Sequence, residues 1–266
     1  MCIRDRTLDA GETCTVGARF EPVANGPHTG TLTATAGPGG SATSNLSGTG
    51  ADPAQLSVTP ATHDYGRQVI GSTSGAQTLT VTNTGGVPSG AVTTGRTGPD
   101  LSDFPVSGDT CNSQSLAAGG TCTVDVSFQP AAAGDREAAL TVSAVAAGGD
   151  QSDLSGEGIT PANLTVTPAR RDFGDVAVGD FEDQVFTIRN TGQQTTGTMG
   201  QVFGVGNGSF NSPDWTCVGN ELDLNETCTV TVRFEPSDAE FDESSFRISA
   251  TPGGSIEAEY TGTGTE

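Results

Sequence analysis

Six cysteines are the residues of this 266-residue chain whose spacing most directly suggests chemistry. Cys122 follows Cys111 by 11 positions, and Cys228 follows Cys217 by the same interval. A repeated cysteine spacing in a strand-rich chain is typical of one local disulfide per domain, formed in an oxidising compartment. The alternative is a pair of free thiols packed in each core, since unpaired cysteine is commonly buried. The sequence predicts the disulfides, each contributing about 2–3 kcal/mol.

Metal chemistry has weaker support. There is no Cys-x-x-Cys pattern, and His28 and His63 are the only histidines, so a zinc site is disfavoured. A cluster of carboxylates near the C-terminus is the one candidate for Ca²⁺, which prefers oxygen ligands. Its members are Asp238, Glu240, Asp242 and Glu243. They lack the spacing of an EF-hand loop, so an ordinary acidic turn is the favoured interpretation, and no cofactor is predicted.

The sequence does not indicate an enzyme. His63 is the only histidine followed by an acid, Asp64, and no Gly-x-Ser-x-Gly motif accompanies it. The chain has no lysine that could form a Schiff base. In the repeat described next, the equivalent positions hold Arg171 and Asp172, which favours a structural role for this pair.

One motif occurs three times and organises the chain. Its copies begin at Leu8, Leu116 and Leu222, and each contains Thr-Cys-Thr-Val followed by Phe-x-Pro. They predict two complete domains, residues 52–158 and 159–266, after residues 1–51, which would be the back half of a truncated domain. Residues 1–6 depart from the repeat and resemble a translated sequencing adapter, so they are excluded from the fold prediction. This organisation predicts a fragment of a longer protein.

Apolar and polar residues alternate within short segments throughout both repeats. Examples are 78–82, 123–128, 140–142, 186–188 and 246–248. Period-two alternation predicts strands with one buried face, and clusters of Gly, Pro, Asn and Ser separate them. The prediction is an all-β protein of tandem immunoglobulin-like β-sandwich domains with about seven strands each. The connectors 51–54 and 159–162 are short and contain one proline each, which favours a semi-rigid string of domains.

The repeat resembles the choice-of-anchor D and ASPM-SPD-2-Hydin class of immunoglobulin-like repeats. The resemblance covers nearly everything after residue 7, and its motifs in the last repeat have counterparts one repeat earlier. These motifs are Leu-Thr-Val-Thr-Pro168, Phe173-Gly174, Asn190-Thr-Gly192, the Cys217 and Cys228 pair, Phe234-Glu-Pro236 and Tyr-Thr-Gly-Thr-Gly264. One departure is Glu240, which stands where the earlier repeats have Gly26 and Gly134. The resemblance implies non-catalytic repeats of large secreted or surface proteins.

Charge and hydropathy exclude several kinds of partner. The net charge is −21, from 32 acidic residues against 11 arginines, which argues against nucleic acid and anionic membranes. No apolar run approaches the ~18 residues of a membrane-spanning helix. The acidic residues favour a solvated surface, and a sharper hypothesis is adaptation to high salt, where screening removes self-repulsion.

These observations predict a structural role. We expect a non-catalytic repeat region of a larger exported protein, at the cell surface or outside the cell, serving as a spacer or adhesive stalk. Its partners would be the neighbouring repeats of the same chain. The alternative is a module that captures a protein or glycan, either on its own or as an accessory region of an extracellular enzyme. Long variable loops in only one repeat would favour binding, and residues 85–109 and 192–215 differ most between the repeats.

Overall fold

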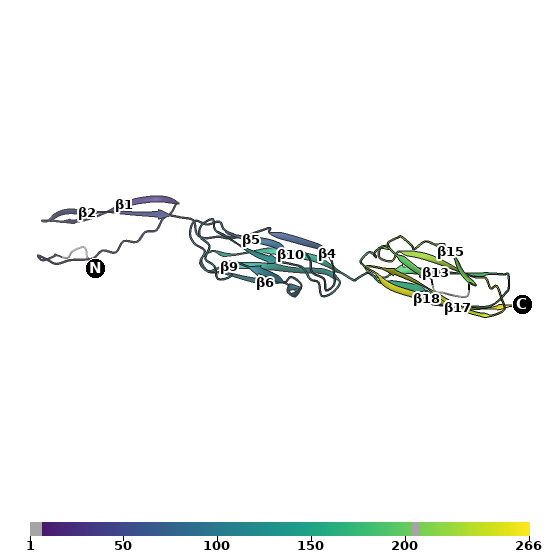
Figure 1. Ribbon diagram of the computed structural model, residues 1–266. Helices are drawn as coiled ribbons and strands as arrows, with labels where there is room; N and C mark the ends of the chain where they lie inside the picture. Colours follow the sequence, from purple (N-terminus) through teal and green to yellow (C-terminus); the bar gives the residue numbers. More distant parts are fainter. Residues whose placement is uncertain (1–6, 204–207) are drawn as a thin grey trace.

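The computed structural model describes residues 7–203 and 208–266, and its regular structure is almost entirely β-strand. These residues form an extended string of a hairpin and two sandwiches arranged end to end (Figure 1). We call these parts the N-terminal hairpin (residues 26–50), the middle sandwich (56–159) and the C-terminal sandwich (164–265). The predicted all-β, immunoglobulin-like sandwich class is confirmed.

The middle sandwich packs two four-stranded sheets face to face, with the orders β3-β5-β8-β7 and β4-β10-β9-β6. Neighbouring strands are antiparallel, except that β4 runs parallel to β10. A short 3₁₀ turn, η1 (Leu101–Asp103), precedes β7. The strands are β3 (Leu56–Thr59), β4 (Thr62–Val69), β5 (Gln77–Asn83), β6 (Val92–Thr97), β7 (Val106–Asp109), β8 (Thr121–Val126), β9 (Gly134–Ala144) and β10 (Gly148–Ile159).

The C-terminal sandwich repeats this topology, with sheet orders β11-β13-β16-β15 and β12-β18-β17-β14. The described part of each sandwich thus has eight strands, one more than the sequence predicts. Short strands at the sheet edges, such as β7, arise from segments with little apolar alternation. The strands are β11 (Leu164–Thr167), β12 (Arg170–Ala177), β13 (Glu182–Asn190), β14 (Gly200–Phe203), β15 (Phe210–Trp215), β16 (Thr227–Phe234), β17 (Phe241–Ala250) and β18 (Gly254–Thr265).

Each core is closed by a phenylalanine ring that lies directly on the backbone of the last strand. A Cβ atom at Gly156 would come within 2.6 Å of the Phe128 ring, and one at Gly262 within 2.5 Å of the Phe234 ring. Both rings are fully buried. The glycine motif that ends each repeat is therefore explained by packing, since any side chain there would displace a core aromatic.

The N-terminal hairpin, β1 (Gly26–Ala36) and β2 (Gly40–Gly50), matches β9 and β10 of the middle sandwich, but no second sheet faces it within the described residues. Leu32, Leu46 and Phe20 are 37%, 41% and 48% exposed, whereas their equivalents in the middle sandwich are buried. Residues 13–18, which match β8, form no strand. This part of the chain therefore exposes residues that serve as core in a complete repeat, and the division into residues 1–51, 52–158 and 159–266 stays a prediction.

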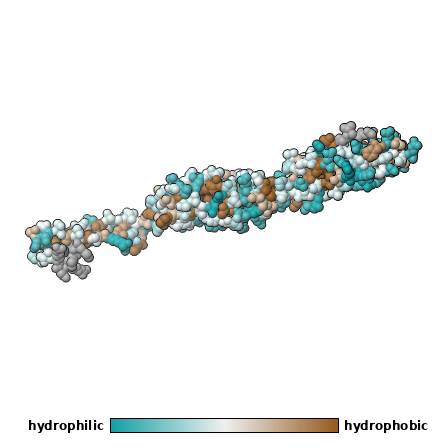
Figure 2. Space-filling model, turned by 90° about the horizontal axis from the view of Figure 1, so that it is seen from below, coloured by the Kyte–Doolittle hydropathy of each residue, from teal (hydrophilic) through white to brown (hydrophobic). Residues whose placement is uncertain are grey.

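The outer surface is predominantly polar. On the face drawn in Figure 2, white and pale colours of intermediate hydropathy cover much of the surface, with teal hydrophilic areas and separate brown apolar patches between them. The net charge of −21 agrees with the acidic surface that the sequence favours. No helix in the described part of the chain has the length and apolarity needed to cross a bilayer.

A fully buried asparagine stands at the same place in both sandwiches, at the end of β5 and of β13. The Asn83 side-chain oxygen accepts hydrogen bonds from the backbone N–H groups of Gln55 (3.2 Å) and Gly85 (3.0 Å). Its amide group donates to three carbonyl oxygens, those of Val87, Leu116 and Ala117. One side chain therefore satisfies backbone hydrogen-bonding groups in two loops and in the residue just before β3.

Asn190 repeats this arrangement in the C-terminal sandwich. Its side-chain oxygen accepts from the N–H groups of Asn163 (3.1 Å) and Gly192 (3.0 Å), and its amide donates to the carbonyl oxygens of Gln194 and Leu222. The Asn-Thr-Gly motif is thus a structural element.

Replacing Asn190 by leucine, which has nearly the same size, should leave these buried backbone groups unsatisfied. We expect the free energy of unfolding of the C-terminal sandwich to fall by about 3 kcal/mol. The chain has one tryptophan, Trp215, so its fluorescence during urea unfolding reports on that sandwich. Asn83→Leu is the matched control and should leave the Trp215 transition in place; equal effects of the two variants would contradict the assignment.

Candidate functional site

Both disulfides predicted from cysteine spacing are present. Cys111 bonds to Cys122 and Cys217 to Cys228, with S–S distances of 2.06 Å. Each joins the residues after an edge strand, β7 or β15, to the adjacent central strand. Cys14 is also disulfide-bonded, and no cysteine in the described residues is free. Cys2 lies outside the described residues.

The loop that carries Cys111 is held by Asp109. Its carboxylate accepts hydrogen bonds from the N–H groups of Cys111 (2.8 Å) and Asn112 (3.0 Å) and from the Thr94 hydroxyl. Partial burial acts to raise the pKa of Asp109, but these hydrogen bonds outweigh it and the pKa lies below its ordinary value. The ionised carboxylate thus stabilises the disulfide-bearing loop.

The four acidic residues proposed for Ca²⁺ are not brought together. Asp238 and Glu240 lie before β17, whereas Asp242 and Glu243 belong to it and point to opposite faces, because side chains alternate along a strand. Within residues 7–203 and 208–266, no group of three or more His, Cys, Asp or Glu side chains could hold a metal ion. The arrangement gives the calcium hypothesis no support.

Asp242 nevertheless has an unusual environment. It is 2% exposed, and neither of its carboxylate oxygens has a hydrogen-bond partner. Strand pairing places it opposite Gly262, as Arg136 stands opposite Gly156 in the middle sandwich. There Arg136 forms ion pairs with Asp100 (2.9 Å) and Asp103 (3.7 Å). The two sandwiches therefore place different residue types, an arginine and an aspartate, at equivalent positions near the same end of the core.

The pair His63 and Asp64 serves the fold of β4. The His63 ring packs edge-on against Tyr65, with ring centroids 4.5 Å apart. The Asp64 carboxylate accepts the N–H of Gly66 at 2.8 Å, as Asp172 does for Gly174 in the next repeat. Tyr65 donates its hydroxyl hydrogen to the Val126 carbonyl oxygen of the facing sheet, and burial raises the pKa of Tyr65 to about 12. These contacts are structural and assemble no catalytic group.

The connector between the two sandwiches is hydrogen-bonded to the C-terminal sandwich. The Thr160 N–H donates to the Gln193 side-chain oxygen (3.0 Å), and the Gln193 N–H donates to the Thr160 hydroxyl (3.0 Å). The Gln194 N–H donates to the Thr160 carbonyl oxygen (3.1 Å). The Gln194 side-chain oxygen accepts a hydrogen bond from the Ala162 N–H at 3.4 Å. The connector is thus hydrogen-bonded to the loop after β13, whereas sequence composition indicated only that it is short and semi-rigid.

The other end of the connector is attached to the middle sandwich. Ile159 ends β10, is buried, and its carbonyl oxygen accepts the N–H of Ile70 at 3.0 Å. Arg67 of β4 forms an ion pair with Glu157 (3.2 Å) and donates to the Gln193 carbonyl oxygen (3.4 Å). Arg67 therefore contacts both sandwiches directly.

Glycine is required where the Asn-Thr-Gly loop meets each connector. A Cβ atom at Gly192 would lie 1.9 Å from the Pro161 carbonyl oxygen, and one at Gly85 would lie 2.1 Å from the Pro53 carbonyl oxygen. Contacts that short are impossible, so any side chain would push the connector away. The same construction thus recurs at the entry to both sandwiches, and these junctions are the candidate functional site.

Comparison with known proteins gives no family assignment. No protein-family model matches the chain, and no curated protein matches it. Similar solved structures include protocadherin gamma B7 extracellular cadherin domains 1–4, 12% identical, covering 90% of this chain and 57% of that one at a TM-score of 0.48. The ASH/PapD-like domain 7 of human CEP192 is 9% identical (40% of this chain, 87% of that one, TM-score 0.32). The secreted serine protease VesC from Vibrio cholerae is 19% identical, and the match covers 75% of this chain and 51% of that one at a TM-score of 0.32. The immunoglobulin-like class of this chain rests on its own paired four-stranded sheets.

Replacing Gly192 by alanine should detach the connector from its sandwich. We expect amide hydrogen exchange at Thr160 and Gln193 to become faster by at least about tenfold, because the hydrogen bonds they form cannot survive the displacement. Gly200→Ala is the control, since a Cβ atom there meets nothing within 4 Å. Unchanged exchange in Gly192→Ala would show that the junction does not depend on this close approach.

Proposed function

We propose that this chain is a non-catalytic tandem repeat region of a larger exported protein and acts as a semi-rigid spacer or adhesive stalk. The observation that carries the proposal is the hydrogen-bonded connector at residues 159–162, tied to both neighbouring sandwiches. A flexible tether needs no such bonds, whereas in a spacer they fix the distance between the ends of the string of domains. The partners of each sandwich are then its neighbours in the same chain, with domains at residues 52–158 and 159–266.

An extracellular or cell-surface location is part of this proposal. Two disulfides at equivalent places support it, because disulfides persist in oxidising compartments. The acidic surface supports a soluble role there, without nucleic acid or anionic membrane as partners. We assign the repeats to the choice-of-anchor D and ASPM-SPD-2-Hydin class on their sequence motifs, whose Asn-Thr-Gly and closing glycine residues have structural roles here.

The alternative is a module that captures a protein or glycan, as a stand-alone adhesin or beside an extracellular enzyme. One observation favours it: the middle sandwich carries a groove on the outer face of one sheet, which the C-terminal sandwich does not reproduce with the same side chains. The two functions are compatible, because a stalk can also bind laterally.

Duplicating residues 52–158 in tandem tests the spacer directly. A rigid stalk should lengthen by about one sandwich, roughly 40 Å for a twelve-residue strand at about 3.3 Å per residue. Small-angle X-ray scattering measures the maximum dimension. The control inserts a Gly/Ser segment of equal residue number, which should add less length and broaden the distance distribution. If the duplicated chain behaves like the Gly/Ser control, or folds back to a compact particle, the spacer function is wrong.

A further inference from the structure

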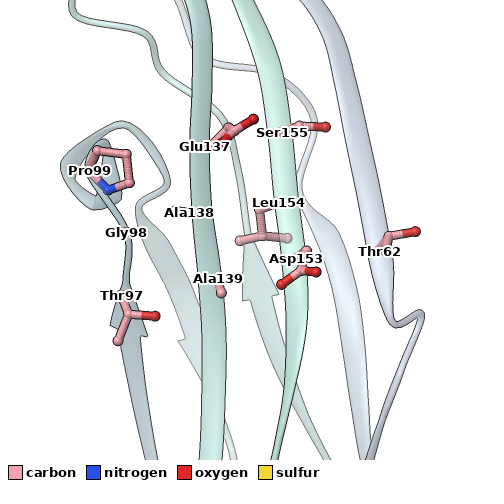
Figure 3. A pocket seen from close by; sticks show the side chains of 10 residues that line it. All are labelled: Thr62, Thr97, Gly98, Pro99, Glu137, Ala138, Ala139, Asp153, Leu154 and Ser155. Carbon is pink, nitrogen blue, oxygen red and sulfur yellow. The ribbon is translucent and has the colours of Figure 1, made fainter.

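A groove of about 400 Å³ lies on the outer face of the sheet β4-β10-β9-β6 in the middle sandwich (Figure 3). Its floor is Ala139, which is only 9% exposed although it points away from the core that its neighbours Ala138 and Leu140 join. Strand pairing aligns one residue from each of the four strands across this floor. They are Thr62, Asp153, Ala139 and Thr97.

Two carboxylates flank the floor of the groove. Asp153 stands directly opposite Ala139, and Glu137 stands two residues from Ala139 on the same strand. Diagonal neighbours of this kind lie about 7–8 Å apart, which leaves room for one cationic group between them. Asp153 accepts a hydrogen bond from the neutral Gln151 amide at 2.7 Å. Neither carboxylate forms an ion pair with any described residue.

The C-terminal sandwich shows which group fits this position. There the pair equivalent to Thr62 and Asp153 is Arg170 and Glu259, adjacent across β12 and β18, and the two side chains form an ion pair. The residue at the place of Ala139 is Ser245, which also fills more space. The C-terminal sandwich therefore supplies its own guanidinium, whereas the middle sandwich keeps the carboxylate and the hollow but has threonine in place of the arginine.

We propose that this groove binds an arginine side chain of a polypeptide partner, with the guanidinium in the place that Arg170 holds in the neighbouring sandwich. Asp153 and Glu137 pair with the cation, while Thr62 and Thr97 offer hydroxyl groups along its edge. A chain of net charge −21 attracts such a basic partner over a distance. This proposal deepens the binding alternative above and does not depend on the spacer function.

Binding can be tested on the full chain by NMR titration with the blocked pentapeptide Gly-Ser-Arg-Ser-Gly. We expect saturable shifts of the backbone amides of Thr62, Ala139 and Asp153, which weaken as NaCl is added because the carboxylates are exposed. The same peptide with neutral citrulline in place of arginine should leave these amides unshifted. Shifts spread evenly over the acidic surface, or equal shifts with the citrulline peptide, would overturn the proposal.

Thr62→Arg is the decisive variant, because it introduces the occupant that the C-terminal sandwich already has. Thr62 is exposed, so the fold should be retained, and the dispersion of the amide spectrum checks this. We expect affinity for the arginine peptide to fall by at least about fivefold. Thr93→Arg adds the same charge at an exposed position of β6 outside the groove and should weaken binding much less. Equal loss in both variants would mean that net charge alone attracts the peptide, which overturns the groove as a site. The scattering test of the duplicated chain is independent of either result.

Discussion

The hydrogen bonds of one buried asparagine in each sandwich are the interaction on which the arrangement depends. Asn83 and Asn190 hold the loop that follows a central strand, and that loop presents a glycine to the incoming connector. A buried amide with all of these partners satisfied fixes its surroundings, whereas an incompletely satisfied one would be costly. A single side chain thereby links the core, the loop and the connector. The connector is therefore held in a defined position relative to the sandwich that follows it.

The two sandwiches share this frame and differ in the charges placed on it. At the end of the core, Arg136 with its two aspartates is replaced by the buried Asp242. On the outer sheet face, Thr62 is replaced by Arg170, which pairs with Glu259. The strand order is the same in both sandwiches although the residues at these two positions differ. Repeats of this kind can therefore keep one architecture while their surfaces acquire different partners.

Much of the fold could be predicted from the sequence, because it depends on local pattern. Period-two alternation predicts the central strands, and the equal spacing of the cysteine pairs predicts both disulfides. The edge strands β7 and β14 could not be found in this way, since they have little alternation. The junction and the groove also escaped prediction. The bonds of Gln193 to Thr160 join residues 33 positions apart, and the groove requires the register of four strands. Asp242 also escaped prediction. The sequence suggests an exposed acidic residue, but the alternation of side chains along β17 buries it.

The central claim is that the connector makes the two sandwiches one semi-rigid body. Residual dipolar couplings of the backbone amides, measured on the intact chain in a weakly aligning medium, test this most directly. If the junction is ordered as described, couplings from residues 56–159 and 164–265 will fit one common alignment tensor in this structure. Two tensors of clearly different magnitude would show independent motion of the sandwiches and contradict the account.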